Sequence, residues 1–124
     1  MKKLLKIVLV SSIPLVLFSC YYDEFPEEPP VVIPPDTVIT FADYVAPIFS
    51  DHTCTDCHNA NGQSPNLSPG SAYNSLINGG YIDLADPYNS KLYKKLEADT
   101  HYRVITAEEK AYIIAWIEDG AQDN

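Results

Sequence analysis

The run Cys54-Thr55-Asp56-Cys57-His58 is the stretch around which we expect the chain to fold. Two thiols three positions apart, followed directly by an imidazole, form the C-x-x-C-H pattern that is typical of covalent haem attachment. In that chemistry the cysteines form thioether bonds to the two vinyl groups of the haem, and the histidine binds the iron from one face. We therefore predict one covalent haem c on Cys54 and Cys57, with His58 as the proximal iron ligand.

Two other uses of the cysteine pair remain open. In an oxidising compartment Cys54 and Cys57 can form a disulfide, although the adjacent His58 then has no role. A structural zinc ion can also be bound by two cysteines and two histidines. Zinc sites usually add a second, distant pair of ligands at a set spacing, and here only His101 can serve as a distant ligand.

Length and charge limit both the fold and the partners. At 124 residues the chain has room for one domain. About 80 residues remain for it after an N-terminal signal and a proline-rich stretch, so its apolar core is marginal and a prosthetic group is an expected source of stability. After residue 19 the chain keeps five basic residues against seventeen acidic ones, a formal charge of −12. This acidity argues against nucleic-acid binding and favours a basic partner protein or simple solubility.

The first 19 residues predict an export signal. A positively charged start, residues 1–6, precedes an apolar run, residues 7–18, that is too short to span a membrane. The sequence Leu17-Phe18-Ser19-Cys20 resembles the lipobox of bacterial lipoproteins, which implies cleavage before Cys20 and lipidation of its thiol. The alternative is an ordinary signal peptide with an incidental cysteine. Lipidation anchors a protein to a membrane without spanning it, so we expect a place in the cell envelope, at the outer membrane on its periplasmic or surface face.

Residues 20–39 predict a linker that is rich in proline and acidic residues. Proline excludes regular helix and central strand, so an extended, semi-rigid tether is expected, which holds the domain off the bilayer. We expect the folded domain to cover residues 40–121 and a short tail to cover residues 122–124.

The first part of this domain predicts short helices around the C-x-x-C-H run. Thr40 can cap a helix whose apolar residues recur at helical spacing, and Pro47 favours its division into two short pieces. A helical turn is expected to place both cysteines and His58 on one side. A loop over residues 59–70 then leads to Ser71, which we expect to cap a helix over residues 72–77.

The second part predicts two more helices and no strands. One begins at residue 86 or 89 and runs through residue 96. The last begins at the capping box Thr106-Ala107-Glu108-Glu109, is apolar nearly all round, and ends at Gly120. We therefore predict an all-α fold, a small bundle of roughly three to four helices around a covalent haem.

Four motifs follow one another along the chain: Pro47-Ile48-Phe49, the C-x-x-C-H run, Ser90-Lys91-Leu92-Tyr93, and Ile113-Ile114-Ala115-Trp116-Ile117 with Gly120-Ala121. In this order they resemble a single-haem cytochrome c domain of the kind found in small bacterial lipoproteins. The resemblance covers residues 45–121. It implies a cytochrome c-like fold in which the first and last helices pack against each other at one edge of the haem.

The chain departs from this family at the sixth iron ligand. Such cytochromes commonly place a methionine opposite the histidine, but the one methionine here is Met1. Where the family often has His-Met-Pro, this sequence has His101-Tyr102-Arg103. Three arrangements stay open: His101 binds the iron through a neutral imidazole nitrogen, Tyr102 binds it as a phenolate, or the position is open to small gases or peroxide.

Electron transfer is the function that these features favour. We expect a membrane-anchored electron carrier with a redox partner protein, because a haem supplies the electron chemistry and no cluster of titratable groups indicates hydrolysis. The negative charge would stabilise the ferric state and lower the reduction potential. The alternative is a haem-based ligand-binding or sensing domain with an open sixth position, and a structural zinc-binding module is the third hypothesis.

Overall fold

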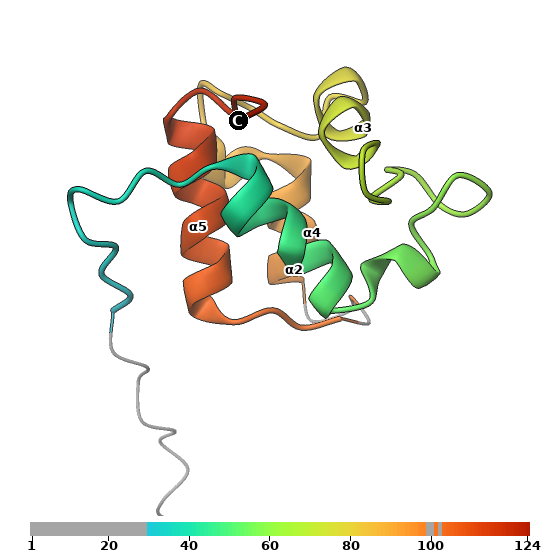
Figure 1. Ribbon diagram of the computed structural model, residues 1–124, viewed down its shortest axis with the longest axis horizontal. Coiled ribbons are helices and arrows are strands. Elements are labelled where there is room, and N and C mark those ends of the chain that lie inside the picture. The colour runs from blue at the N-terminus through green and yellow to red at the C-terminus, as the bar shows by residue number, and fades with distance from the viewer. Residues whose placement is uncertain (1–29, 99–100, 102) are drawn as a thin grey trace, which may run out of the picture. The chain divides into compact units, whose positions relative to one another are not determined.

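The computed structural model describes residues 30–98, 101 and 103–124, and Val31–Asn124 form one compact unit. The secondary structure of the described residues is entirely helical, so the predicted all-α class is confirmed (Figure 1). The α-helices are α2 (Ala46–Asp51), α3 (Ala72–Asn78), α4 (Lys91–Glu97) and α5 (Ala107–Glu118). Shorter helical turns are η1 (Phe41–Val45), η2 (Cys54–Asp56) and η3 (Pro87–Asn89). The predicted signal peptide and Cys20 lie outside the described residues.

The first helical segment consists of two pieces joined end to end, as the sequence predicts. Thr40 caps it, because its hydroxyl oxygen accepts a hydrogen bond from the backbone N–H of Asp43 at 3.1 Å. The wide turn η1 closes when the N–H of Ala46 donates to the carbonyl of Phe41, five residues earlier. Pro47 follows in the first turn of α2, where its missing N–H costs no helical hydrogen bond.

Helix α5 is the centre of the domain, and η1, η3 and α4 all contact it. Its capping box forms as predicted: the hydroxyl of Thr106 accepts from the N–H of Glu109, and the carboxylate of Glu109 accepts from the N–H of Thr106. Ile113, Trp116 and Ile117 are at most 1% exposed. The prediction that this helix is mostly buried is therefore confirmed.

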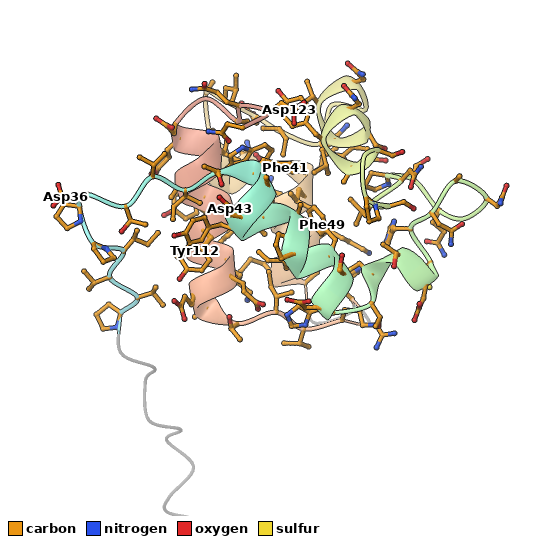
Figure 2. The ribbon with its side chains drawn as sticks, in the orientation of Figure 1. Asp36, Phe41, Asp43, Phe49, Tyr112 and Asp123 are labelled. Atoms are coloured by element: carbon orange, nitrogen blue, oxygen red, sulfur yellow. The ribbon has the colours of Figure 1, made fainter. Side chains whose placement is uncertain are left out.

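Aromatic contacts join the first and last helical segments. The ring centres of Phe41 and Trp116 lie 5.1 Å apart, and those of Tyr44 and Tyr112 also lie 5.1 Å apart. Figure 2 labels Phe41 on η1 and Tyr112 on α5, where the two segments cross. Such pairs add about 0.5–1.5 kcal/mol each to the area that they bury, so this crossing is a main contact of the core.

The C-terminal residues are hydrogen-bonded to this core. The backbone N–H of Phe41 donates to the side-chain oxygen of Asn124, and that of Ala42 to its backbone carbonyl, both at 2.9 Å. The indole N–H of Trp116 donates to the carbonyl of Gln122. At the other end of the compact unit, Ile39 is 5% exposed and belongs to the same core. Parts of the expected linker and of the expected tail thus contribute to the folded domain.

Helices α3 and α4 are short and are held by the loop between them. Ser71 precedes α3 as predicted, but its side chain makes no capping hydrogen bond. In the loop, the N–H of Asp83 donates to the hydroxyl of the buried Ser90, and the N–H of Leu92 donates to the carbonyl of Tyr81 at 3.1 Å. These bonds place Tyr81 beside the first turn of α4. No helix among the residues described is long and apolar enough to cross a membrane.

Candidate functional site

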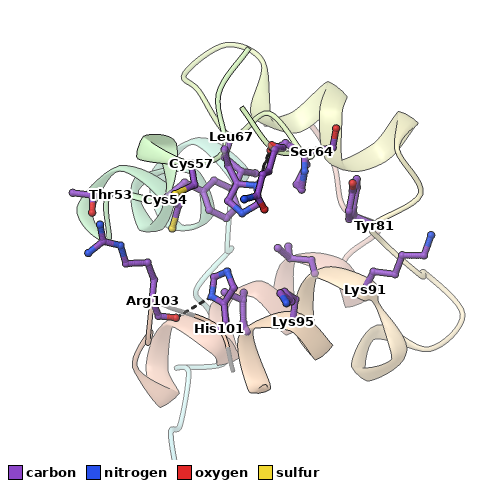
Figure 3. Close-up of a pocket in the computed structure, with 16 residues that line it drawn as sticks. Thr53, Cys54, Cys57, Ser64, Leu67, Tyr81, Lys91, Lys95, His101 and Arg103 are labelled. Carbon is purple, nitrogen blue, oxygen red and sulfur yellow. Dashed lines mark hydrogen bonds between the residues drawn. The ribbon is translucent and has the colours of Figure 1, made fainter. Parts of the chain in front are cut away.

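One pocket of about 480 Å³ collects four residues that the sequence singles out: Cys54, Cys57, His58 and His101. Its volume lies within the range of about 300–1,000 Å³ that is usual for small-molecule and cofactor sites. Figure 3 shows the cysteines on the wall opposite His101, with open space between. Phe49, Pro65, Leu67, Leu92 and Leu96 form the apolar part of the lining.

The two cysteines reach the pocket because the chain turns tightly after α2. Thr53 has a positive φ of 51°, which reverses the chain, and η2 follows at once. The N–H of His58 then donates to the carbonyl of Cys54 at 2.9 Å, so one turn separates the first cysteine from the histidine. Both thiols are free rather than joined in a disulfide. Cys54 is buried and Cys57 is exposed, and burial raises the pKa of the Cys54 thiol.

The imidazole of His58 is held in one tautomer. Its Nδ1 lies 3.1 Å from the carbonyl oxygen of Pro65 and 3.2 Å from that of Gln63. Since a carbonyl oxygen can only accept, Nδ1 carries the proton and donates it, and Nε2 keeps its lone pair. Metal-binding histidines usually donate their second ring nitrogen to a carbonyl or carboxylate in this way. The hydrogen bonds of His58 thus leave its Nε2 as the nitrogen that could bind a metal.

A close approach of the backbone shapes the loop that supplies these carbonyls. The N–H of Gln63 donates to the carbonyl of Cys57, and the N–H of Leu67 donates to the carbonyl of His58, both at 2.8 Å. Gly62 lies against the first of these bonds: a Cβ there would sit 2.1 Å from the Cys57 oxygen. Only glycine fits at this position, and the loop can therefore fold back over His58.

His101 faces the same pocket from the other side, and its ring is also oriented. Its Nδ1 lies 3.1 Å from the carbonyl of Arg103, so this nitrogen donates and Nε2 is free to bind a metal. The ring centres of His58 and His101 are 6.4 Å apart, with 36° between the ring planes. Two imidazoles that bind one metal ion from opposite sides, with metal–nitrogen bonds of about 2.0–2.1 Å, have ring centres about 6.3 Å apart. The observed separation of the ring centres is close to that value.

Two ion pairs connect the elements that surround the pocket. Arg103, beside His101, pairs with Asp56 of η2 at 3.2 Å. His52, at the end of α2, lies 2.8 Å from the carboxylate of Glu109 in α5. Burial alone would raise the pKa of Glu109, but hydrogen bonds from Thr106 and His52 outweigh it and lower that pKa. Both pairs are partly exposed, so each contributes at most about 1 kcal/mol to the free energy of unfolding. The two contacts link η2 to the segment before α5 and the end of α2 to α5.

Several pocket residues were not predicted from the sequence. Tyr81, Lys91, Lys95 and Arg103 also line it, and none of the lining residues that the structure describes is acidic. The sequence did contain a signal for the two lysines. Lys91 and Lys95 are two of the five basic residues that follow residue 19, and they stand four positions apart on one face of a predicted helix. Tyr102, the weaker candidate for the sixth position, lies outside the described residues.

Comparisons with known proteins add no relative. No protein-family model, no curated protein and no solved structure matches the chain. Within the part of the chain that the structure describes, no group of three or more His, Cys, Asp or Glu side chains is placed to hold a metal ion. The chemistry of the pocket therefore has to be argued from its own residues, which include two free thiols and two imidazoles.

Proposed function

We propose that residues 31–124 form a c-type cytochrome domain that carries one covalent haem and transfers electrons in the cell envelope. A single observation carries the proposal: Cys54, Cys57, His58 and His101 line one apolar pocket, and both imidazoles keep Nε2 free at a ring separation of 6.4 Å. A haem bound there would supply one-electron transfer at its iron. The protein would hold it by thioether bonds to both cysteines, with His58 and His101 on opposite faces of the ring.

The chain's own residues would set the properties of such a centre. Carbonyl oxygens hold the Nδ1–H of both histidines, which raises the basicity of Nε2 and strengthens binding to the ferric ion. Two imidazole ligands in place of histidine and methionine lower the reduction potential, because methionine ligation raises it. The acidity of the chain acts in the same direction. We therefore expect a low-potential electron carrier.

The proposal includes a lipid anchor on Cys20, which keeps the domain at a membrane while a redox partner protein docks and leaves. The acidic, proline-rich residues that follow Cys20 support this arrangement, because such a composition gives an extended, soluble spacer.

Haem attachment is tested by producing the full chain in a host that is competent for cytochrome c maturation. The expected product is red, gives the pyridine haemochrome spectrum of a haem with two thioether bonds, and gains the mass of one haem. Variants Cys54→Ala and Cys57→Ala serve as matched controls, and each is expected to lose one thioether bond. Colourless wild-type protein with no mass gain refutes the proposal, and one zinc ion per chain would instead identify a structural zinc module.

The sixth ligand decides between electron transfer and ligand sensing. With His101 bound, the reduced protein shows sharp low-spin bands and binds carbon monoxide slowly. Replacement His101→Ala should turn the iron high-spin and make carbon monoxide binding fast and complete. A low-spin spectrum that survives in this variant removes His101 from the ligand set. Fast carbon monoxide binding by the wild type points to an open site and a sensing role.

A further inference from the structure

The basic residues of the domain are not distributed at random. Lys91, Lys94, Lys95, Arg103 and Lys110 are the five that follow residue 19, and three of them line the main pocket. None of the lining residues that the structure describes is acidic. The described wall of the candidate cofactor site is therefore rich in basic residues for a strongly acidic chain.

Two of these cations have no ion-pair partner among the residues that the structure describes. Lys110 pairs with Glu97, Arg103 pairs with Asp56, and Lys94 donates to the side chain of Asn89. Lys91 and Lys95, in contrast, make no ion pair or hydrogen bond with any residue that the structure describes. The ammonium group of Lys91 lies 6.0 Å from the centre of the Tyr81 ring, which also lines the pocket. Exposed ammonium groups at the wall of a pocket can bind an anionic group of a ligand there.

The position of these lysines matches the chemistry of the haem. Lys91 and Lys95 stand one helical turn apart on α4, where Leu92 and Leu96 face the same pocket. Figure 3 shows Cys54 and Cys57 toward one end of the pocket and Tyr81 and Lys91 at the opposite end, with Lys95 along the wall between. In haem the two propionate groups are attached to the two pyrrole rings that carry no vinyl group. Attachment of the vinyl edge to the cysteines therefore directs the carboxylates away from them.

We infer that Lys91 and Lys95 bind the two propionate carboxylates of the haem, with the Tyr81 hydroxyl as an added donor, and so decide which way round the ring enters the pocket. This inference rests on the proposed function. Ammonium–carboxylate hydrogen bonds are stronger than neutral ones, and here they neutralise two further negative charges on a chain that already carries a formal charge of −12 after residue 19. The lysines are positioning residues for the cofactor and take no part in iron ligation.

Zero-length coupling of the haem-loaded full chain tests the contact directly. A water-soluble carbodiimide joins a carboxylate to an amine within contact distance, and the water that is lost converts the reagent to a urea. After proteolysis, mass spectrometry should find the haem peptide with Cys54 and Cys57 joined to a peptide of α4 through Lys91 or Lys95. The variant Lys91→Gln/Lys95→Gln should lose this product. The matched control Lys94→Gln/Lys110→Gln removes the same charge outside the pocket and should retain it.

The ratio of reduced to oxidised protein at a fixed solution potential gives a second readout. Loss of the two pocket lysines should lower this ratio about tenfold, equivalent to about 59 mV for one electron, and the control pair should change it less than twofold. Equal shifts in both pairs, or a wild-type protein without the cross-link, overturn the inference. A shift of the wild-type ratio on adding inorganic phosphate, with no cross-link, identifies free phosphate as the ligand of the lysines and also overturns it. Failure of the proposed function is distinct from these outcomes, because the wild type then carries no haem.

Discussion

Replacement Gly62→Ala should damage the site although Gly62 itself does not line the pocket. The added Cβ would lie 2.1 Å from the carbonyl oxygen of Cys57, whereas ordinary contacts begin at 3.4 Å. The loop must therefore retreat by more than an ångström. That movement breaks the 2.8 Å bond from the N–H of Gln63 to Cys57 and withdraws the carbonyls that hold Nδ1 of His58.

The cost can be worked from these bonds. A typical hydrogen bond contributes about 0.5–1.5 kcal/mol, so losing the Gln63 bond and the contacts to His58 costs about 2–3 kcal/mol. The lower chain entropy of alanine in the unfolded state returns about 0.4–1 kcal/mol. We expect a net loss of about 2 kcal/mol in the free energy of unfolding. For a domain of this size such a loss lowers Tm by about 8–16 °C.

Thermal and urea unfolding followed by circular dichroism at the helical band measure this loss. The matched control is Gly70→Ala, where no atom lies within 4 Å of the new Cβ but φ is +77°. Backbone strain there should cost about 1–2 kcal/mol and leave the haem spectrum unchanged, because the added Cβ has no atom within 4 Å to displace. In Gly62→Ala the spectrum should also change, since the His58 ring loses its orientation. Stability within about 0.5 kcal/mol of wild type would show that the loop does not approach Cys57 as described.

Three further predictions concern the core, the pH dependence and the anchor. Ile113→Ala should lower the free energy of unfolding by about 2–5 kcal/mol because this side chain is fully buried, whereas Ile77→Ala, at an exposed position, should cost less than about 1 kcal/mol; urea unfolding compares them. The pKa of Glu109 is lowered on folding, so its carboxylate stabilises the folded protein at pH values above its ordinary pKa of 4.5. This contribution to the free energy of unfolding is lost as the pH falls through the pKa of the folded state. Glu109→Gln should therefore flatten the acid side of a plot of Tm against pH, and an unchanged acid slope would show that the hydrogen bonds of Glu109 with Thr106 and His52 do not form in solution. Cys20→Ala should prevent lipidation and release the protein from the membrane fraction, as intact-mass measurement and fractionation would show; a variant that keeps its lipid mass places the anchor elsewhere.

The helices were largely predictable from local chemistry. The capping box at Thr106, the cap at Thr40 and the division at Pro47 depend on neighbours within four residues, and all three were confirmed. The bond from the indole of Trp116 to Gln122 was not predictable, because it joins residues across the end of a helix. The same is true of the bonds that Asn124 accepts from the first helical segment, 83 residues away.

The candidate site also combines features that the sequence predicts with features that only the tertiary structure shows. The residue types and spacing of Cys54, Cys57 and His58 are sufficient to predict a haem site, since the chemistry needs two thiols and an imidazole within one turn. Sequence alone left His101 as one of three choices for the sixth position, because its distance from His58 depends on how a loop before α5 packs against the loop after α2. Only the tertiary structure places the two rings 6.4 Å apart and brings Lys91 and Lys95 of α4 to the wall of the same pocket. Short-range hydrogen bonds depend on neighbouring residues and can be predicted from the sequence. Contacts across the pocket depend on how the whole core packs.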